Sequence, residues 1–125
     1  MARSETVRRV KSYSSATGYV YQYYFFEVTL AQRASERGRE YIYVVSADRQ
    51  STFALKIFVA KTAVELWAKR VGRALTGTEE YAVAKLRLFQ GFDELASLHS
   101  AADAEKADLR VDESNLDNLL EQLDI

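Results

Sequence analysis

The sequence predicts an α+β fold, a four-stranded antiparallel sheet with two helices packed on one face, followed by an acidic C-terminal tail that ends in a short amphipathic helix. Three observations predict this fold. Apolar residues alternate with a period of two up to residue 60, they recur with a helical period from residue 61, and acidic residues concentrate after residue 102. A chain of 125 residues is long enough for one domain with a core.

Four candidate strands are separated by short polar connections. They are TVRRVKSY (6–13), YVYQYYFFEVTLA (19–31), EYIYVVS (40–46) and FALKIFVA (53–60), joined by SSATG, QRASERGR and ADRQST. Because the connections are short and rich in residues that favour turns, we expect consecutive strands to pair as an antiparallel meander.

The second candidate strand carries aromatic side chains on both of its sides. One side holds Tyr19, Tyr21, Tyr23 and Phe25, and the other holds Val20, Gln22, Tyr24, Phe26, Val28 and Leu30. The second side is the more aliphatic, so we expect it to face the helices. The tyrosine face, which Tyr41, Tyr43 and Phe58 extend, would then form an exposed aromatic patch larger than monomers usually leave uncovered.

Two helices are predicted after residue 61. Thr62 and Glu65 have the spacing of a capping box and precede an apolar stripe that includes Trp67. Thr76 and Glu79 repeat the pattern, which predicts a second helix from about residue 78. These helices would cover one face of the sheet.

The tail differs from the rest of the chain in charge. Residues 103–125 carry a net charge of -6, whereas the preceding residues carry +5. Four leucines have the spacing of one helical face: Leu116, Leu119, Leu120 and Leu123. We therefore expect an α+β domain over 1–98, an acidic linker over 99–113 and a docking helix over 114–125. Two alternatives remain open: the helix packs on its own domain, or the tail folds back onto the basic body.

No pattern typical of an enzyme is present. The chain lacks cysteine, a glycine-rich phosphate loop and the common hydrolase motifs, and its one histidine, His99, falls where the second helix should end. We expect no enzymatic activity, no cofactor and no bound metal. Since no apolar run approaches the roughly 20 residues of a membrane span, we expect a cytoplasmic protein without a membrane partner.

The favoured hypothesis is a non-catalytic protein-binding or adaptor module. It would self-associate, for example as a homodimer, or dock a partner through the tyrosine face, and the leucines of the tail would be a second docking element. The proposed contact residues are Tyr19, Tyr21, Tyr23, Phe25, Tyr41, Tyr43, Leu116, Leu119, Leu120 and Leu123. A third possibility is that the sheet curls and the tyrosines pack among themselves.

The alternative function is binding of single-stranded nucleic acid. Tyr21 and Tyr23 would stack on bases, while the acidic tail would compete with phosphates. The cations that would contact phosphates are Arg8, Arg9, Lys11, Arg37 and Arg39. The order of strands, helices and acidic tail resembles the layout of single-strand binding proteins, although no motif is shared.

Overall fold

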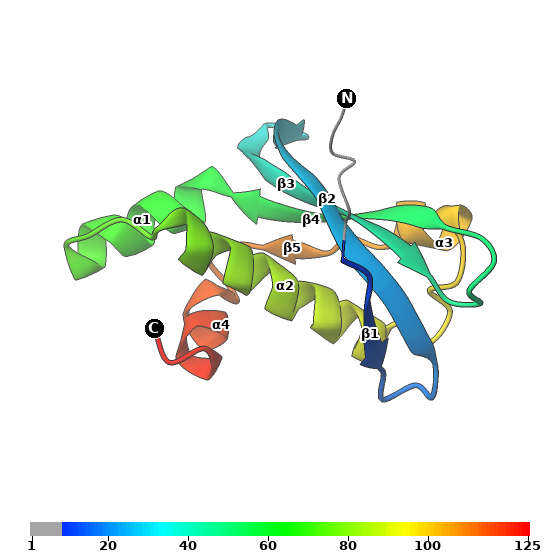
Figure 1. Ribbon diagram of the computed structural model, residues 1–125. Coiled ribbons are helices and arrows are strands. Elements are labelled where there is room, and N and C mark those ends of the chain that lie inside the picture. Colours follow the sequence, from blue (N-terminus) through cyan, green and yellow to red (C-terminus); the bar gives the residue numbers. More distant parts are fainter. Residues whose placement is uncertain (1–8) are drawn as a thin grey trace, which may run out of the picture.

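The computed structural model describes residues 9–125, which form an α+β structure with a curled five-stranded mixed sheet and four helices (Figure 1). The strands are β1 (Lys11–Ser14), β2 (Val20–Arg33), β3 (Glu36–Ser46), β4 (Phe53–Ala60) and β5 (Arg110–Val111). The helices are α1 (Lys61–Val71), α2 (Gly77–Glu94), α3 (Ala101–Lys106) and α4 (Leu116–Gln122). Strands β1 to β4 form the predicted antiparallel meander, and β5 adds to β4 in parallel. Residues 6–8 of the first predicted strand lie outside the described residues, and the loop predicted over 32–39 is mostly strand with a two-residue turn.

The tyrosine face is the inner face of the sheet, and the prediction that the more aliphatic side faces the helices is wrong. Helix α2 crosses this face (Figure 1), and the ring of Phe92 stacks on that of Tyr21 with centroids 4.2 Å apart. Tyr21, Tyr23, Tyr41 and Tyr43 are buried. The physical reason is area: an aromatic side chain buries about 150 to 250 Å², more than valine does, so a side rich in tyrosine is the larger apolar surface.

A β-bulge in β2 divides this strand into two parts with opposite alternation. The register with β3 shifts between Phe25 and Glu27. Before the bulge the odd-numbered residues of β2 face inward, whereas after it Val28 pairs with Tyr41 and so shares the inner face. An unbroken alternation through this strand was expected, which grouped Val28 and Leu30 with Val20 and Phe26, whereas the bulge places them on the same face as Tyr21 and Tyr23.

The two long helices begin differently. Thr76 caps α2 with the predicted capping box, since its side chain accepts a hydrogen bond from Glu79 N–H and the Glu79 carboxylate accepts one from Thr76 N–H. Helix α1 begins two residues earlier than the Thr62–Glu65 pattern requires, and its N-cap residue, Ala60, offers no side-chain hydrogen bond. The capping box predicted for the first helix is therefore wrong.

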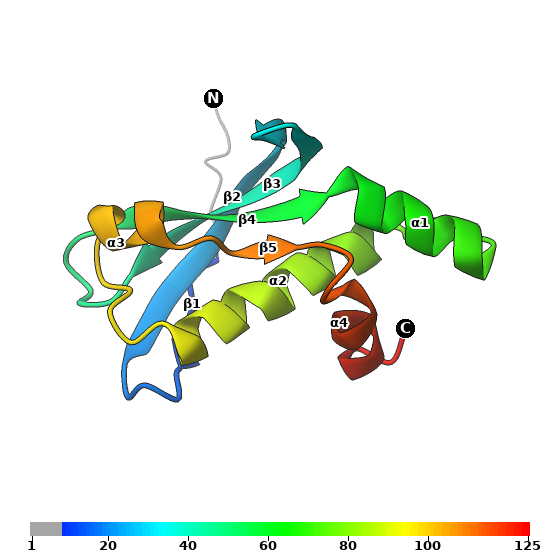
Figure 2. The ribbon, with the colours of Figure 1, turned by 180° about the vertical axis from the view of Figure 1, so that it is seen from behind.

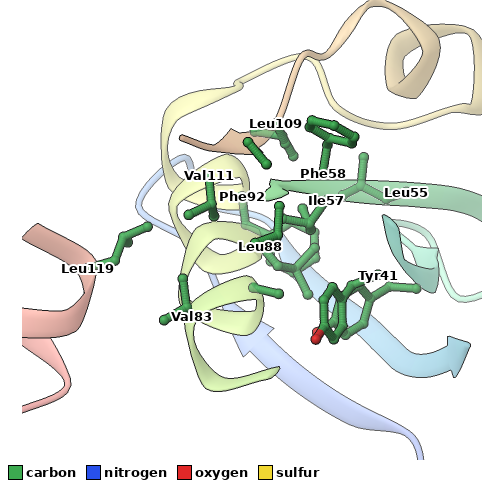
Figure 3. Packing of buried hydrophobic residues seen from close by; sticks show 14 of the residues in the cluster. Tyr41, Leu55, Ile57, Phe58, Val83, Leu88, Phe92, Leu109, Val111 and Leu119 are labelled. Carbon is green, nitrogen blue, oxygen red and sulfur yellow. The ribbon is translucent and has the colours of Figure 1, made fainter. Parts of the chain in front are cut away.

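The tail belongs to the same packed core. The segment expected to be a linker, 99–113, contains α3 and β5, and Leu109 and Val111 in it are buried. Helix α4 packs on α2, and Leu119 points from α4 toward α2 (Figures 2 and 3). A two-residue strand is too short to leave a periodic pattern, which is why the sequence did not predict β5.

Ion pairs account for part of the division of charge along the chain. Asp117 of α4 lies 2.6 Å from an Arg70 guanidinium nitrogen, and Asp108 lies 2.9 Å from one of Arg33. The guanidinium groups of Arg33 and Arg110 both lie over the ring of Phe58, at 5.0 and 5.9 Å from its centroid. The acidic tail is thus folded back onto basic residues of the body, which is one of the two alternatives stated above.

We expect Glu79→Gln to make the fold less sensitive to acid. Hydrogen bonds from Arg73 and from Thr76 N–H lower the pKa of Glu79 from 4.5 to about 2. A carboxyl group whose pKa is lowered by folding stabilises the protein above its ordinary pKa, and this contribution is lost as the pH falls from 4.5 to about 2. Urea unfolding at neutral pH and at about pH 3 should show a smaller loss of stability for Glu79→Gln than for the wild type.

Glu105→Gln is the matched control, because Glu105 is exposed in α3 and has no ion-pair partner among the described residues. An equal change in acid sensitivity for both variants would contradict the role of the capping box.

Candidate functional site

Most of the side chains proposed as a docking face are buried inside the protein. Tyr21, Tyr23, Tyr41 and Tyr43 lie under α2, and Phe25 is half-buried against Tyr81. Tyr19 remains 42% exposed, with its ring 4.0 Å from that of His99. A partner therefore cannot reach the buried tyrosines in this structure. Packing among the aromatic residues of a curled sheet, the third possibility, describes the arrangement better.

The leucines proposed as tail anchors are also engaged. Leu116, Leu119 and Leu120 are buried in the core, and Leu123 is half-buried against it. In this structure they contact their own domain, so the tail presents no row of exposed leucines to a second partner.

The residues of the nucleic-acid alternative do not form one surface. Arg8 lies outside the described residues, Arg9 and Lys11 are exposed near β1, and Arg37 and Arg39 are exposed on β3. Tyr21 and Tyr23, which were to stack on bases, are buried. The structure therefore leaves these cations exposed without the two tyrosines that were to stack on bases.

A hollow lies where the β2–β3 hairpin extends past the start of α2. We call it the hairpin groove. Its floor is a row of residues paired across three strands, Leu30 with Arg39 and Arg39 with Val59. Helix α1 forms one wall through Lys61, Val64 and Glu65, and Glu80 of α2 closes one end. Ala31, Gln32, Arg37 and Gly38 complete the lining, and the volume is about 720 Å³.

Buried Glu80 organises the charges of the hairpin groove. Its Oε1 accepts a hydrogen bond of 2.7 Å from the Tyr41 hydroxyl and lies 3.2 Å from Nε of Arg39. Glu80 is only 6% exposed, so these two partners replace the water that a carboxylate would otherwise bind. Burial and the hydrogen bond to Glu80 raise the pKa of Tyr41, which keeps this phenol a donor. The contacts hold Arg39, half of whose side chain is exposed, at the floor of the groove.

Sequence reasoning did not identify Glu80 as a site residue. In the sequence it stands beside Glu79 at the start of a helix, where both carboxylates are expected to interact with the helix dipole. Its partners Tyr41 and Arg39 lie on a strand far away in the sequence, so no local pattern could reveal the cluster. Leu30 was missed for another reason: it was expected under the helices, and it lies on the inner face but beyond the reach of α2.

The rim of the hairpin groove is apolar and lies along a strand edge. Leu30 is 87% exposed and Val28 44% exposed, both on the inner face but beyond the reach of α2. Strand β1 pairs only with the Val20–Tyr23 end of β2. In the part of the chain that the structure describes, no strand pairs with the outer edge of β2 over residues 27–33.

His99 contains a buried polar atom. Nε2 of His99 is buried and has no hydrogen-bond partner among the described residues, so this histidine is less solvated than its place in the sequence suggested.

Within residues 9–125, no helix is long and apolar enough to cross a membrane, and no three side chains of His, Cys, Asp and Glu gather as a metal site would require.

The chain matches no protein-family model, and no similar protein was found for it among the curated proteins or the solved structures.

Proposed function

We propose that this protein is a non-catalytic protein-binding module, and that the hairpin groove with its rim of Val28 and Leu30 docks an apolar, acidic segment of a partner protein. One observation carries the proposal. Leu30, a large aliphatic side chain on the inner face of a sheet, is 87% exposed at the edge of a groove whose lining includes Val59 and Val64.

The charge of the hairpin groove supports an acidic segment. Arg37 has no ion-pair partner among the described residues, and Lys61 has only an exposed contact of 3.8 Å with Glu65. Glu80 is already satisfied by Tyr41 and Arg39. A carboxylate of the partner would therefore meet cations that are available to bind it.

The proposal keeps the class of function that the sequence favoured and moves its location. The tyrosine face and the tail leucines are not offered as docking elements, because the core occupies them. Binding of single-stranded nucleic acid is not proposed, because its stacking residues Tyr21 and Tyr23 are buried. The exposed residues of the hairpin take over the role of contact surface.

We expect Leu30→Asp to weaken partner binding by at least tenfold, because burying one leucine in a complex contributes about 1.5 to 3 kcal/mol. The probes are peptides selected from a random library on the immobilised wild-type protein, and the measurement is fluorescence anisotropy. Arg37→Gln should weaken acidic peptides by about fivefold, the worth of a good exposed ion pair, and should not weaken the same peptides with Gln in place of Glu.

Val20→Asp and Lys56→Gln are the matched controls, since both side chains are exposed on the sheet away from the hairpin groove. If no selected peptide distinguishes Leu30→Asp from Val20→Asp, the hairpin groove is not the docking site.

A further inference from the structure

We propose that the partner segment binds as a β-strand, added to the outer edge of β2 over residues 27–33, with apolar side chains on Val28 and Leu30 and a carboxylate toward the hairpin groove. This inference rests on the proposed function and specifies how the partner is held. Addition of a strand to an exposed edge is a common mode of peptide recognition, in which main-chain hydrogen bonds supply affinity and side-chain pockets supply specificity.

The turn of the hairpin shows which backbone groups of β2 face this edge. Arg33 pairs with Glu36 across a two-residue loop, and Ala34 in this loop has a φ of 54°. The residues that flank such a loop bond to one another, so Arg33 directs its N–H and C=O toward β3. Because the direction alternates along an antiparallel strand, the backbone groups of Val28, Leu30 and Gln32 point to the outer edge.

The bulge between Phe25 and Glu27 is one of the usual protections of an edge strand, but the outer edge beyond it lacks others. From residue 27 to residue 33 it contains no proline and no lysine, and β1 ends before it. Its inner-face side chains are aliphatic at two successive positions, Val28 and Leu30. An added strand would cover both side chains and pair the outward N–H and C=O groups at the same time.

The charges identify the occupant as an acidic strand. The inner face beside this edge carries Arg37 and Arg39 on the neighbouring strand and Lys61 at the start of α1. Of the acids that line the groove, Glu80 is buried and paired, and Glu65 lies on the exposed side of α1. An extended segment with aliphatic residues and a glutamate or aspartate directed to this face complements the site in shape and in charge.

The test separates backbone pairing from side-chain contact at one position. Leu30→Pro removes the outward N–H of residue 30 without removing a hydrogen bond to β3, and proline is tolerated on an edge strand. Leu30→Ala removes most of the side chain and keeps this N–H. We expect acidic peptides selected on the wild type to bind Leu30→Pro at least tenfold more weakly than Leu30→Ala. Gln32→Pro with Gln32→Ala repeats the comparison should Leu30→Pro fail to fold.

Hydrogen exchange measured by NMR on the full chain provides the second readout. Peptide binding should slow the amides of Val28, Leu30 and Gln32, while the amide of Thr29, already directed to β3, should change little. Equal affinity of the proline and alanine variants, with no slowing of these amides, would overturn the strand model and leave the groove as a docking site. If no selected peptide bound the wild-type protein through the hairpin groove, the proposed function itself would be refuted.

Two other occupants of the edge are distinguished by the same variants. If sedimentation shows a wild-type dimer that Leu30→Pro converts to a monomer, the edge pairs with a second copy of the chain. If removal of residues 1–8 makes the Leu30 and Gln32 amides exchange faster in the absence of peptide, the chain covers its own edge. Either result would overturn the assignment of the edge to a partner protein.

Discussion

Replacing Leu119 with alanine lowers the free energy of unfolding by about 2 to 5 kcal/mol, the range for a leucine removed from a packed core. Leu119 is 1% exposed and points from α4 toward α2 (Figure 3). The neighbouring Leu120 is 2% exposed, so Leu119→Ala with Leu120→Ala should lower the stability further. A small domain has a total stability of about 5 to 15 kcal/mol, and the double variant should therefore be largely unfolded at moderate temperature.

Urea unfolding followed by circular dichroism measures the effect, and Glu121→Ala is the control on the same helix because Glu121 is exposed. An exposed α4, docking only on a partner, would give the opposite result: unchanged stability for Leu119→Ala and lost affinity for the partner. A loss of stability in Leu119→Ala, with no loss in Glu121→Ala, would confirm that α4 belongs to the core.

The tail shows what the sequence could and could not predict. The spacing of its leucines predicts an amphipathic helix, because only positions three and four apart share one helical face. The surface that receives the helix is not predictable in the same way. Val83 and Val111, which belong to the same buried cluster as Leu119, come from α2 and β5, and a strand of two residues leaves no periodic signal.

The sheet was predictable in its strand order and not in its orientation. Alternation and short connections identify β1 to β4, since both are local properties of the sequence. The face that the helices cover depends instead on the summed area of Tyr21, Tyr23, Tyr43 and their partners on α2, which hydropathy underestimates for tyrosine. The bulge after Phe25 then reverses the alternation, so that Leu30 shares the face of the tyrosines instead of that of Val20.

The hairpin groove follows from the same two features. Because the bulge returns Val28 and Leu30 to the inner face beyond α2, aliphatic side chains remain uncovered next to Arg39 and Glu80. No stretch of sequence contains this arrangement, since β2, β3, α1 and α2 each contribute to it. The candidate site is therefore a product of the tertiary structure, whereas the strands that form it are visible in the sequence.

Tyr21→Ala should be as damaging as any substitution in the sheet, with a loss of about 3 to 5 kcal/mol in the free energy of unfolding. The ring of Tyr21 is fully buried and stacks on Phe92 at an interplanar angle of 10°. The adjacent Val20, 43% exposed on the opposite face, is the matched control, and Val20→Ala should change stability by no more than about 0.5 kcal/mol. Thermal and urea unfolding of the two variants therefore tests which face of β2 is covered.

The Tyr21 hydroxyl adds a finer test of the same packing. It is buried and makes no well-formed hydrogen bond to a described residue, although the Thr17 side chain is a polar neighbour. A buried polar group without a partner costs about 1 to 3 kcal/mol, so Tyr21→Phe should leave stability unchanged or raise it, while keeping the stacked ring. If Tyr21→Phe were instead destabilising, the hydroxyl would have a partner, such as an ordered water. If Tyr21→Ala were as mild as Val20→Ala, the tyrosine face would be exposed, and the docking surface predicted from the sequence would replace the hairpin groove as the site to test.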